Sequence, residues 1–138
     1  MNSFAKNNGK KTKMKTAEQK NKVDLSYYLG TWVNSYEKAR VIESFTFSEN
    51  NGKIQMTVKN SKVGFYSGNW GSGELKPHSY APDTNDVVAF QARFELEDMD
   101  AFLAINENKG LLIIAAYFTF KQSDDRSDCF VREFFYKI

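Results

Sequence analysis

The stretch Tyr28-Leu29-Gly30-Thr31-Trp32 divides the sequence into two parts of different character. Before it, residues 1–22 are rich in Lys, Asn and Thr and carry seven Lys against one Glu, a net charge of +6. After it, short segments of alternating apolar and polar residues follow one another, as is typical of β-strands. We therefore predict a disordered basic tail over residues 1–22 and a folded domain over residues 23–138, whose net charge is −4.

The composition fits one domain held together by burial of apolar side chains. The chain has 138 residues, of which 41% are hydrophobic, and it contains twelve Phe, seven Tyr and two Trp. Its one cysteine, Cys129, excludes an internal disulfide and a cysteine-rich zinc site. No apolar run approaches the ~20 residues of a membrane span, and the N-terminus lacks the apolar core of a secretory signal. We expect a soluble, non-exported protein of the cytoplasm.

A hairpin is predicted around Asn51–Gly52, because both positions of its two-residue turn need a positive φ. This turn pairs Phe47 with Met56 and Phe45 with Val58 on one face of the hairpin. The opposite face then pairs polar with polar residues, so the register is consistent on both faces.

A second hairpin is predicted from the alternation after residue 87 and a tight turn at Glu97–Asp98. Its register places opposite one another the pairs Phe94 and Ala101, Ala92 and Leu103, and Phe90 and Ile105. A turn around residues 108–110 then adds a third strand, with Phe118 and Phe120 on the same face. The third strand is apolar on its other face too, which predicts cover on both sides, either by the residues before Trp32 or by a second copy in a homodimer.

Seven to nine short strands joined mostly by hairpins are therefore expected over residues 30–138. Such a chain closes naturally into an all-β, antiparallel up-and-down barrel of about eight strands, with a β-sandwich as the alternative. Residues 60–86, which are rich in Gly and aromatic residues, are expected to form one or two short, bulged strands and a long loop. A short helical segment within residues 16–28 is expected to plug one end of the barrel.

Three residues give the chain a resemblance to the calycins, the superfamily of lipocalins, fatty-acid-binding proteins and avidins. Gly30 and Trp32 resemble the Gly-x-Trp motif at the entry of the calycin barrel, and Arg132 lies in the final strand, where calycins place an Arg that packs across the entry Trp. The resemblance implies a structural role for Gly30, Trp32 and Arg132. The chain lacks the signal peptide and the Thr-Asp-Tyr element of secreted lipocalins. It has Arg132-Glu133-Phe134 where fatty-acid-binding proteins have an Arg-x-Tyr clamp.

The predicted function is binding of a small hydrophobic or amphipathic ligand inside the barrel, which has room for one ligand when it has eight strands. The candidate ligand contacts are Phe45, Phe47, Met56, Val58, Trp70, Phe90, Phe94, Leu103, Ile105, Phe118 and Phe120. Trp70 is either an aromatic lid at the mouth of the barrel or a core residue. Arg132 is either an anchor for a ligand carboxylate or phosphate or the calycin structural residue. The loop before the last strand could instead turn Glu133 inward, and the sequence leaves this phase open.

Two other functional classes remain open. One is a protein-interaction or structural module whose barrel is packed solid, and the other is a calycin-like enzyme that uses Arg132, Glu43 and a Tyr. An enzyme is less expected, because no nucleophile and base stand at a recognisable spacing. No cofactor or metal is expected, since His78 is the only histidine and the acidic residues 95–100 lack the spacing of a calcium loop. The tail lacks the Arg and interleaved aromatic residues of nucleic-acid-binding arms, so we do not expect nucleic-acid binding.

Overall fold

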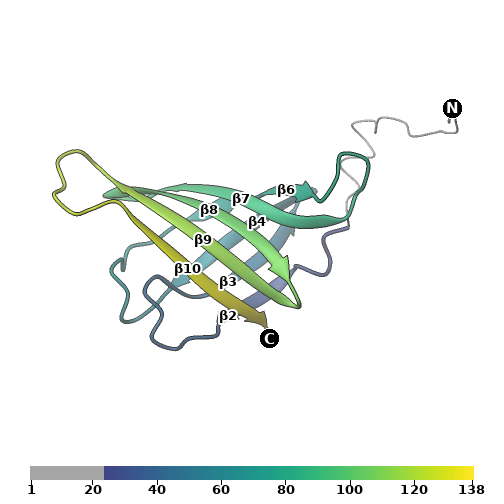
Figure 1. The fold of residues 1–138 in the computed structure, drawn as a ribbon, viewed down its shortest axis with the longest axis horizontal. Helices are drawn as coiled ribbons and strands as arrows, with labels where there is room; N and C mark the ends of the chain where they lie inside the picture. The colour runs from purple at the N-terminus through teal and green to yellow at the C-terminus, as the bar shows by residue number, and fades with distance from the viewer. Residues whose placement is uncertain (1–23) are drawn as a thin grey trace, which may run out of the picture.

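The computed structural model describes residues 24–138 as one antiparallel sheet of nine strands, rolled into a nearly closed barrel (Figure 1). The strands are β2 (Gly30–Asn34), β3 (Ile42–Asn50), β4 (Lys53–Asn60), β5 (Ser72–Glu74), β6 (Lys76–Ser79), β7 (Val87–Glu95), β8 (Met99–Asn108), β9 (Leu111–Phe120) and β10 (Cys129–Lys137). Their order in the sheet is β5-β4-β3-β2-β10-β9-β8-β7-β6. β2 and β10, the first and last of the described strands, are therefore neighbours, and the predicted antiparallel barrel is confirmed with nine strands.

Both predicted hairpin registers are confirmed. Phe47 lies opposite Met56 and Phe45 opposite Val58, and the turn residues Asn51 and Gly52 have φ angles of 54° and 79°. The β7–β8 hairpin pairs Phe94 with Ala101, Ala92 with Leu103, and Phe90 with Ile105. The turn chemistry and the pairing of apolar side chains thus determine the same register.

The described residues before β2 form a turn, and its Leu25 and Tyr28 side chains are buried in the core of the barrel. The Asp24 carboxylate accepts the backbone N–H of Ser26 at 3.0 Å, and the N–H of Tyr28 donates to Leu25 O at 2.9 Å. Tyr28 is buried, and its hydroxyl donates to Val87 O. No helix occurs within residues 24–138, so the predicted helical segment is wrong over 24–28. Its remainder and the predicted tail, residues 1–22, lie outside the described residues.

The sheet is not hydrogen-bonded between β5 and β6, which are its two edge strands. Packing closes this seam, because a Cβ at Gly73 on β5 would lie 2.4 Å from the ring of Phe94 on β7. The prediction of short, bulged strands within residues 60–86 is confirmed by β5, by β6 and by a register shift at His78/Ser79. Only a glycine lets β5 approach the Phe94 ring this closely.

Trp32 is completely buried at the start of the barrel wall. Its ring is parallel to that of Phe45, with centroids 6.5 Å apart, and its Nε1–H donates to Tyr28 O at 2.9 Å. Trp32 therefore lies in the core at the start of β2, as predicted.

The last strand turns Glu133 and Phe135 inward and Arg132 outward. Cys129 lies opposite the inward-facing Phe118, so every second residue from Cys129 onward faces the interior. Phe135 is completely buried, whereas Arg132 is exposed. An Arg132 inside the barrel, whether as ligand anchor or packed across Trp32, is therefore incompatible with the observed phase. With Glu133 inward, its buried carboxylate accepts three backbone N–H groups. An inward Arg132 would instead need a buried partner for its charge.

Candidate functional site

The predicted interior residues do face the inside of the barrel, where they pack mainly against one another. Phe45 and Phe47 have ring centroids 4.9 Å apart, and Phe47 and Phe90 have centroids 5.4 Å apart. Phe135 adds a further ring 4.9 Å from Phe45. The other buried members of the predicted set are Met56, Phe94, Leu103, Ile105, Phe118 and Phe120, and Val58 is partly buried. Edge-to-face and tilted aromatic contacts of this kind fill space as a protein core does.

Trp70 belongs to the same core. Its side chain is buried, and its ring lies edge-on to those of Phe94, at 5.1 Å, and Phe118, at 6.3 Å. Its Nε1–H donates to Asn60 Oδ1 at 2.6 Å, which satisfies the indole donor inside the fold. Of the two roles predicted for Trp70, its position fits the core residue.

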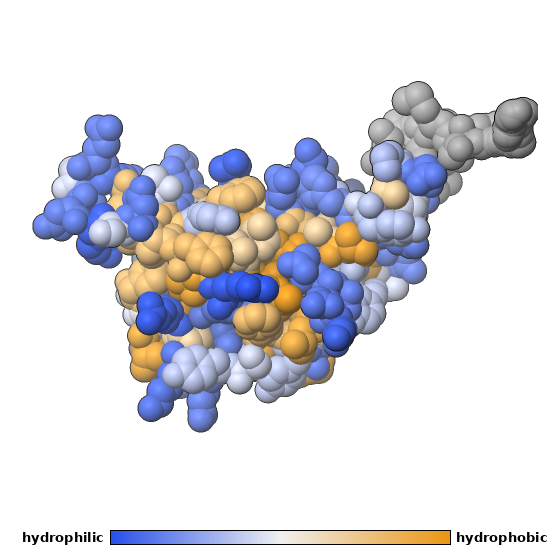
Figure 2. Space-filling view, viewed as in Figure 1, coloured by the Kyte–Doolittle hydropathy of each residue, from blue (hydrophilic) through white to orange (hydrophobic). Residues whose placement is uncertain are grey.

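An outer aromatic face covers strands β8 to β10 on the solvent side of the barrel. We give this name to five side chains that point outward: Phe102, Tyr117, Phe130, Phe134 and Tyr136. Phe130 is 52% exposed and Tyr117 50% exposed, and their ring centroids are 5.0 Å apart. Figure 2 shows hydrophobic side chains gathered over this side of the molecule, with hydrophilic ones around and across them. Apolar residues thus line both faces of the β9 region, and on the outer face the described residues bury Ile113 but leave Tyr117 half exposed.

The register explains the shape of the outer aromatic face. Phe102, Tyr117 and Phe130 lie side by side in one row across the three strands. The next row contains Ala104 and Ala115, whose small side chains stand between larger neighbours. The face is therefore a row of three rings beside a row in which Ala115 lies between Arg132 and Ala104.

Two arginines lie among the exposed rings. The guanidinium carbon of Arg93 is 4.5 Å from the centre of the Phe102 ring, and that of Arg132 is 5.4 Å from the centre of the Phe134 ring. Both are cation–π contacts. Within residues 24–138, the ion pairs closer than 4 Å involve other basic side chains, so neither arginine is neutralised by a carboxylate there. Glu43 forms an ion pair with Lys59, whose Nζ lies 2.9 Å from Glu43 Oε2.

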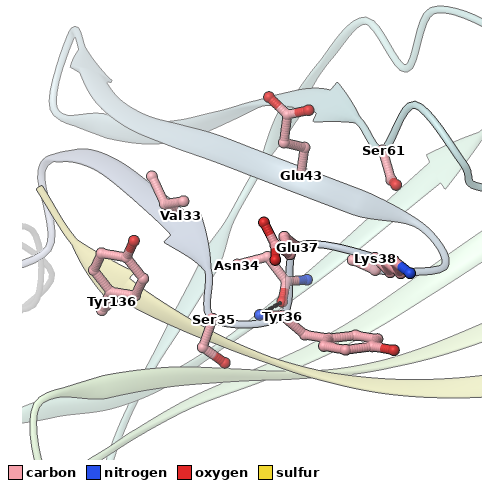
Figure 3. A pocket seen from close by; sticks show the side chains of 10 residues that line it. Val33, Asn34, Ser35, Tyr36, Glu37, Lys38, Glu43, Ser61 and Tyr136 are labelled. Atoms are coloured by element: carbon pink, nitrogen blue, oxygen red, sulfur yellow. Dashed lines mark hydrogen bonds between the residues drawn. The ribbon is translucent and has the colours of Figure 1, made fainter.

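The loop between β2 and β3, residues 35–41, separates two hollows in the outer wall. One has a volume of about 720 Å³, and its lining comes from β2, β3, β10, the loop itself and Ser61, which follows β4 (Figure 3). The other has a volume of about 280 Å³ and lies between the loop and β10. Its lining residues are Asn34, Ser35, Tyr36, Ala39, Arg40 and the run from Phe130 to Phe134. We call this second hollow the β10 pocket, since it adjoins the outer aromatic face through Phe130 and Phe134.

Glu133 fixes the loop against β10. Its two carboxylate oxygens accept the backbone N–H groups of Arg40, Val41 and Ile42 at 3.1, 3.3 and 3.2 Å. Burial raises the pKa of Glu133, against the opposing effect of these three hydrogen bonds. The carboxylate is fully used in holding the loop, so its role is structural.

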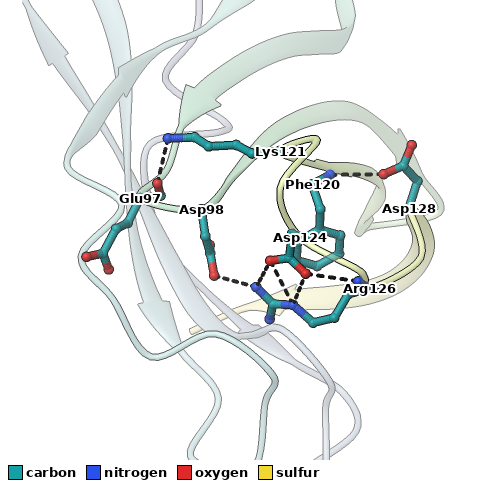
Figure 4. A network of polar contacts seen from close by, with 7 residues as sticks. All are labelled: Glu97, Asp98, Phe120, Lys121, Asp124, Arg126 and Asp128. Carbon is teal, nitrogen blue, oxygen red and sulfur yellow. Dashed lines mark hydrogen bonds and ion pairs between the residues drawn. The ribbon is translucent and has the colours of Figure 1, made fainter.

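A network of charged residues fixes the loop that leads into β10 (Figure 4). Arg126 binds the carboxylates of Asp98 and Asp124, and its guanidinium lies 4.2 Å from the centre of the Phe120 ring. These hydrogen bonds from Arg126 hold the pKa of Asp124 at about 2. The Phe120 N–H donates to Asp128 Oδ1 at 2.9 Å, directly before the strand begins. The network therefore supports the phase in which β10 presents its aromatic residues to solvent.

Comparison with protein-family models, with curated proteins and with solved structures found no match to this chain. Among residues 24–138 there is no group of three or more His, Cys, Asp or Glu side chains placed to hold a metal ion. The same residues include no helix long and apolar enough to cross a membrane.

Phe130, Phe134 and Arg40 were not among the residues that the sequence predicted for a site. The signal that could have found the face was already present in residues 111–120, whose two apolar faces predict a second contact surface. Nothing in the sequence places Arg40 beside β10, because residues 40 and 132 are brought together only when β2 pairs with β10.

Proposed function

We propose that this protein is an interaction module, a packed barrel whose outer aromatic face binds an apolar and acidic segment of another protein. The observation that carries the proposal is the phase of β10, which exposes Phe130, Phe134 and Tyr136 and turns Cys129 and Glu133 inward. The strand thus directs its more aromatic side toward solvent, against the usual preference for burial.

The size of the exposed patch supports this function. A Phe or Tyr side chain offers roughly 150–250 Å² of surface. Exposures of 36% to 52% at Tyr117, Phe130, Phe134 and Tyr136 then leave about 270–460 Å² of aromatic surface in contact with water. The largest apolar patch of a typical soluble monomer has about this size and is often functional.

The charges on and beside the face indicate the kind of partner. Arg93 and Arg132 lie over rings of the outer aromatic face, and Arg40 lines the adjoining β10 pocket. A second copy of the chain that packs about a two-fold axis through the β10 pocket would bring Arg40 and Arg132 close to the same arginines of its partner, and like charges repel. A segment that alternates apolar residues with Asp or Glu complements both the rings and the arginines, and we therefore favour it over a homodimer.

We further infer that the barrel is a calycin-like scaffold in which Lys137 takes the place expected for the arginine. Lys137 Nζ lies 6.0 Å from the centre of the Trp32 ring and donates to Tyr27 O at 2.8 Å. A cation near the entry Trp thus comes from the end of the last strand, five residues after Arg132. Gly30 has a φ of 116°, a conformation that favours glycine at the position of the entry motif.

Random-peptide display on the purified protein tests the proposed function. Selection should enrich peptides that carry aromatic or aliphatic residues next to Asp or Glu. Their binding should fall at least tenfold in the double variant Tyr117→Ser, Phe130→Ser. The matched control is Tyr80→Ser, which changes a tyrosine that is 68% exposed and lies outside the outer aromatic face.

The alternative of a ligand inside the barrel gives a different result in the same set of variants. An environment-sensitive apolar dye that binds at one per chain, equally in the wild type and in the double variant, would favour the interior ligand. Failure to enrich any peptide, or equal loss of binding in Tyr80→Ser, would refute the outer face as an interaction site. Circular dichroism of each variant checks that the barrel remains folded.

A further inference from the structure

The β10 pocket combines two exposed arginines with aromatic walls. Arg132 projects outward from β10 between Phe130 and Phe134, and Arg40 approaches the same pocket from the loop 35–41. Both arginine side chains are exposed, and no described carboxylate lies within 4 Å of either. The pocket therefore holds two positive charges beside apolar surface.

The backbone of Arg40 is fixed on both sides, so its side chain starts from a defined position. Its N–H donates to Glu133 Oε2 at 3.1 Å, and its carbonyl oxygen accepts the N–H of Phe65 at 3.1 Å. A Cβ at Gly64 would lie 2.6 Å from the same carbonyl oxygen, so the chain packs closely around it. Arg132 is fixed in turn by the β9–β10 pairing, where it lies opposite Ala115. Two cationic side chains thus project from well-anchored backbone, which lowers the entropy lost on binding an anion.

The one acidic side chain in the lining of the pocket does not neutralise these arginines. Glu133 points into the barrel and accepts the three backbone N–H groups of residues 40–42. Glu37 and Glu43 line the larger hollow on the other side of the loop, and Glu43 is paired with Lys59. An incoming carboxylate would meet guanidinium groups in the β10 pocket.

We propose that the β10 pocket receives one carboxylate side chain of the partner segment, bound by Arg40 and Arg132, while its apolar neighbour packs on Phe130 and Phe134. This inference rests on the proposed function and names the chemistry of the contact. The volume of about 280 Å³ lies just below the range of roughly 300–1,000 Å³ typical of sites for whole small molecules, and it suits one or two side chains. The planar guanidinium binds a carboxylate through two parallel hydrogen bonds, which makes Arg the suitable residue at both positions.

The test uses the tightest-binding acidic peptide from the display selection and a copy in which Gln and Asn replace its Glu and Asp. Fluorescence anisotropy measures the binding of both peptides to the wild type, Arg40→Gln, Arg132→Gln and Arg93→Gln. We expect the wild type to prefer the acidic peptide at least tenfold, as charge-assisted hydrogen bonds allow. Arg40→Gln and Arg132→Gln should each remove most of this preference, and Arg93→Gln, on the same face but outside the pocket, should keep it.

The outcomes separate the inference from the proposed function. If selection enriches apolar peptides without Asp or Glu, or if both peptides bind equally, the outer face binds partners but the carboxylate pocket is wrong. Equal effects of Arg93→Gln and Arg132→Gln would also overturn the pocket, because general charge rather than position would then determine affinity. If no peptide is enriched at all, the proposed function fails together with this inference.

Discussion

Replacement of Glu133 by Gln tests how β10 holds the loop 35–41. The wild-type carboxylate accepts three backbone N–H groups, and those of Val41 and Ile42 are buried. A Gln side chain keeps one oxygen acceptor and places an NH₂ group against donors. At least one buried N–H then loses its acceptor, which costs about 1–3 kcal/mol. Because the uncharged Gln also avoids the cost of burying an ionised group, we expect a net loss of stability of about 1–2 kcal/mol at neutral pH.

The pH dependence gives the same experiment a second result. Burial raises the pKa of Glu133 above its ordinary value of 4.5, so the folded protein retains this proton to a higher pH than the unfolded chain does. The corresponding stabilisation is complete below the unfolded pKa and is lost as pH rises through the folded pKa. The stability difference between wild type and Glu133→Gln, measured by urea denaturation, should therefore shrink as pH rises above about 4.5. An equal stability of the two proteins at every pH would refute the assigned role of Glu133.

Three further predictions concern the core and its seam. Trp32→Ala should cost about 3–5 kcal/mol in urea denaturation, and a loss below about 1 kcal/mol would mean that Trp32 is not a core anchor. Gly73→Ala should cost about 1–3 kcal/mol, because the added Cβ meets the ring of Phe94; Ser72→Ala is the control, and an unchanged midpoint for Gly73→Ala would show that the seam is open. Burial raises the pKa of Tyr28 to about 12. The stability that its protonated hydroxyl contributes should therefore be present below pH 10 and lost between pH 10 and 12. Ultraviolet titration of the wild type and Tyr28→Phe checks this prediction, which a Tyr28 ionising near pH 10 would contradict.

The barrel could be predicted because its hairpins carry local information that agrees on both faces. Asn51–Gly52 determines a turn, the turn determines a register, and that register places apolar side chains opposite one another. The same logic predicts the β7–β8 pairing through Glu97–Asp98. Each of these inferences needs only residues close together in the sequence, and each was confirmed.

The candidate site could not be predicted in the same way, because it is built from contacts between distant residues. Glu133 binds the backbone of residues 40–42, more than 90 positions earlier in the chain. The position of Arg40 beside Arg132 follows from this contact and from the β2–β10 pairing. No turn signal in the sequence predicts either contact. The sequence alone therefore does not show that Arg40 and Arg132 line the same pocket.

The phase of β10 links the outward position of Arg132 to the function that we propose. An aromatic pattern at Phe130, Phe134 and Tyr136 would normally predict the buried face of a strand, which would place Arg132 inside. In the observed phase, Phe135 is completely buried and the Glu133 carboxylate accepts three backbone N–H groups of the β2–β3 loop. The Arg126 network also fixes the loop that leads into β10. These polar contacts outweigh the preference for burying more rings. The aromatic residues left outside are therefore a consequence of how the loop is held, and a partner that covers them would recover the burial that folding of the chain alone does not achieve.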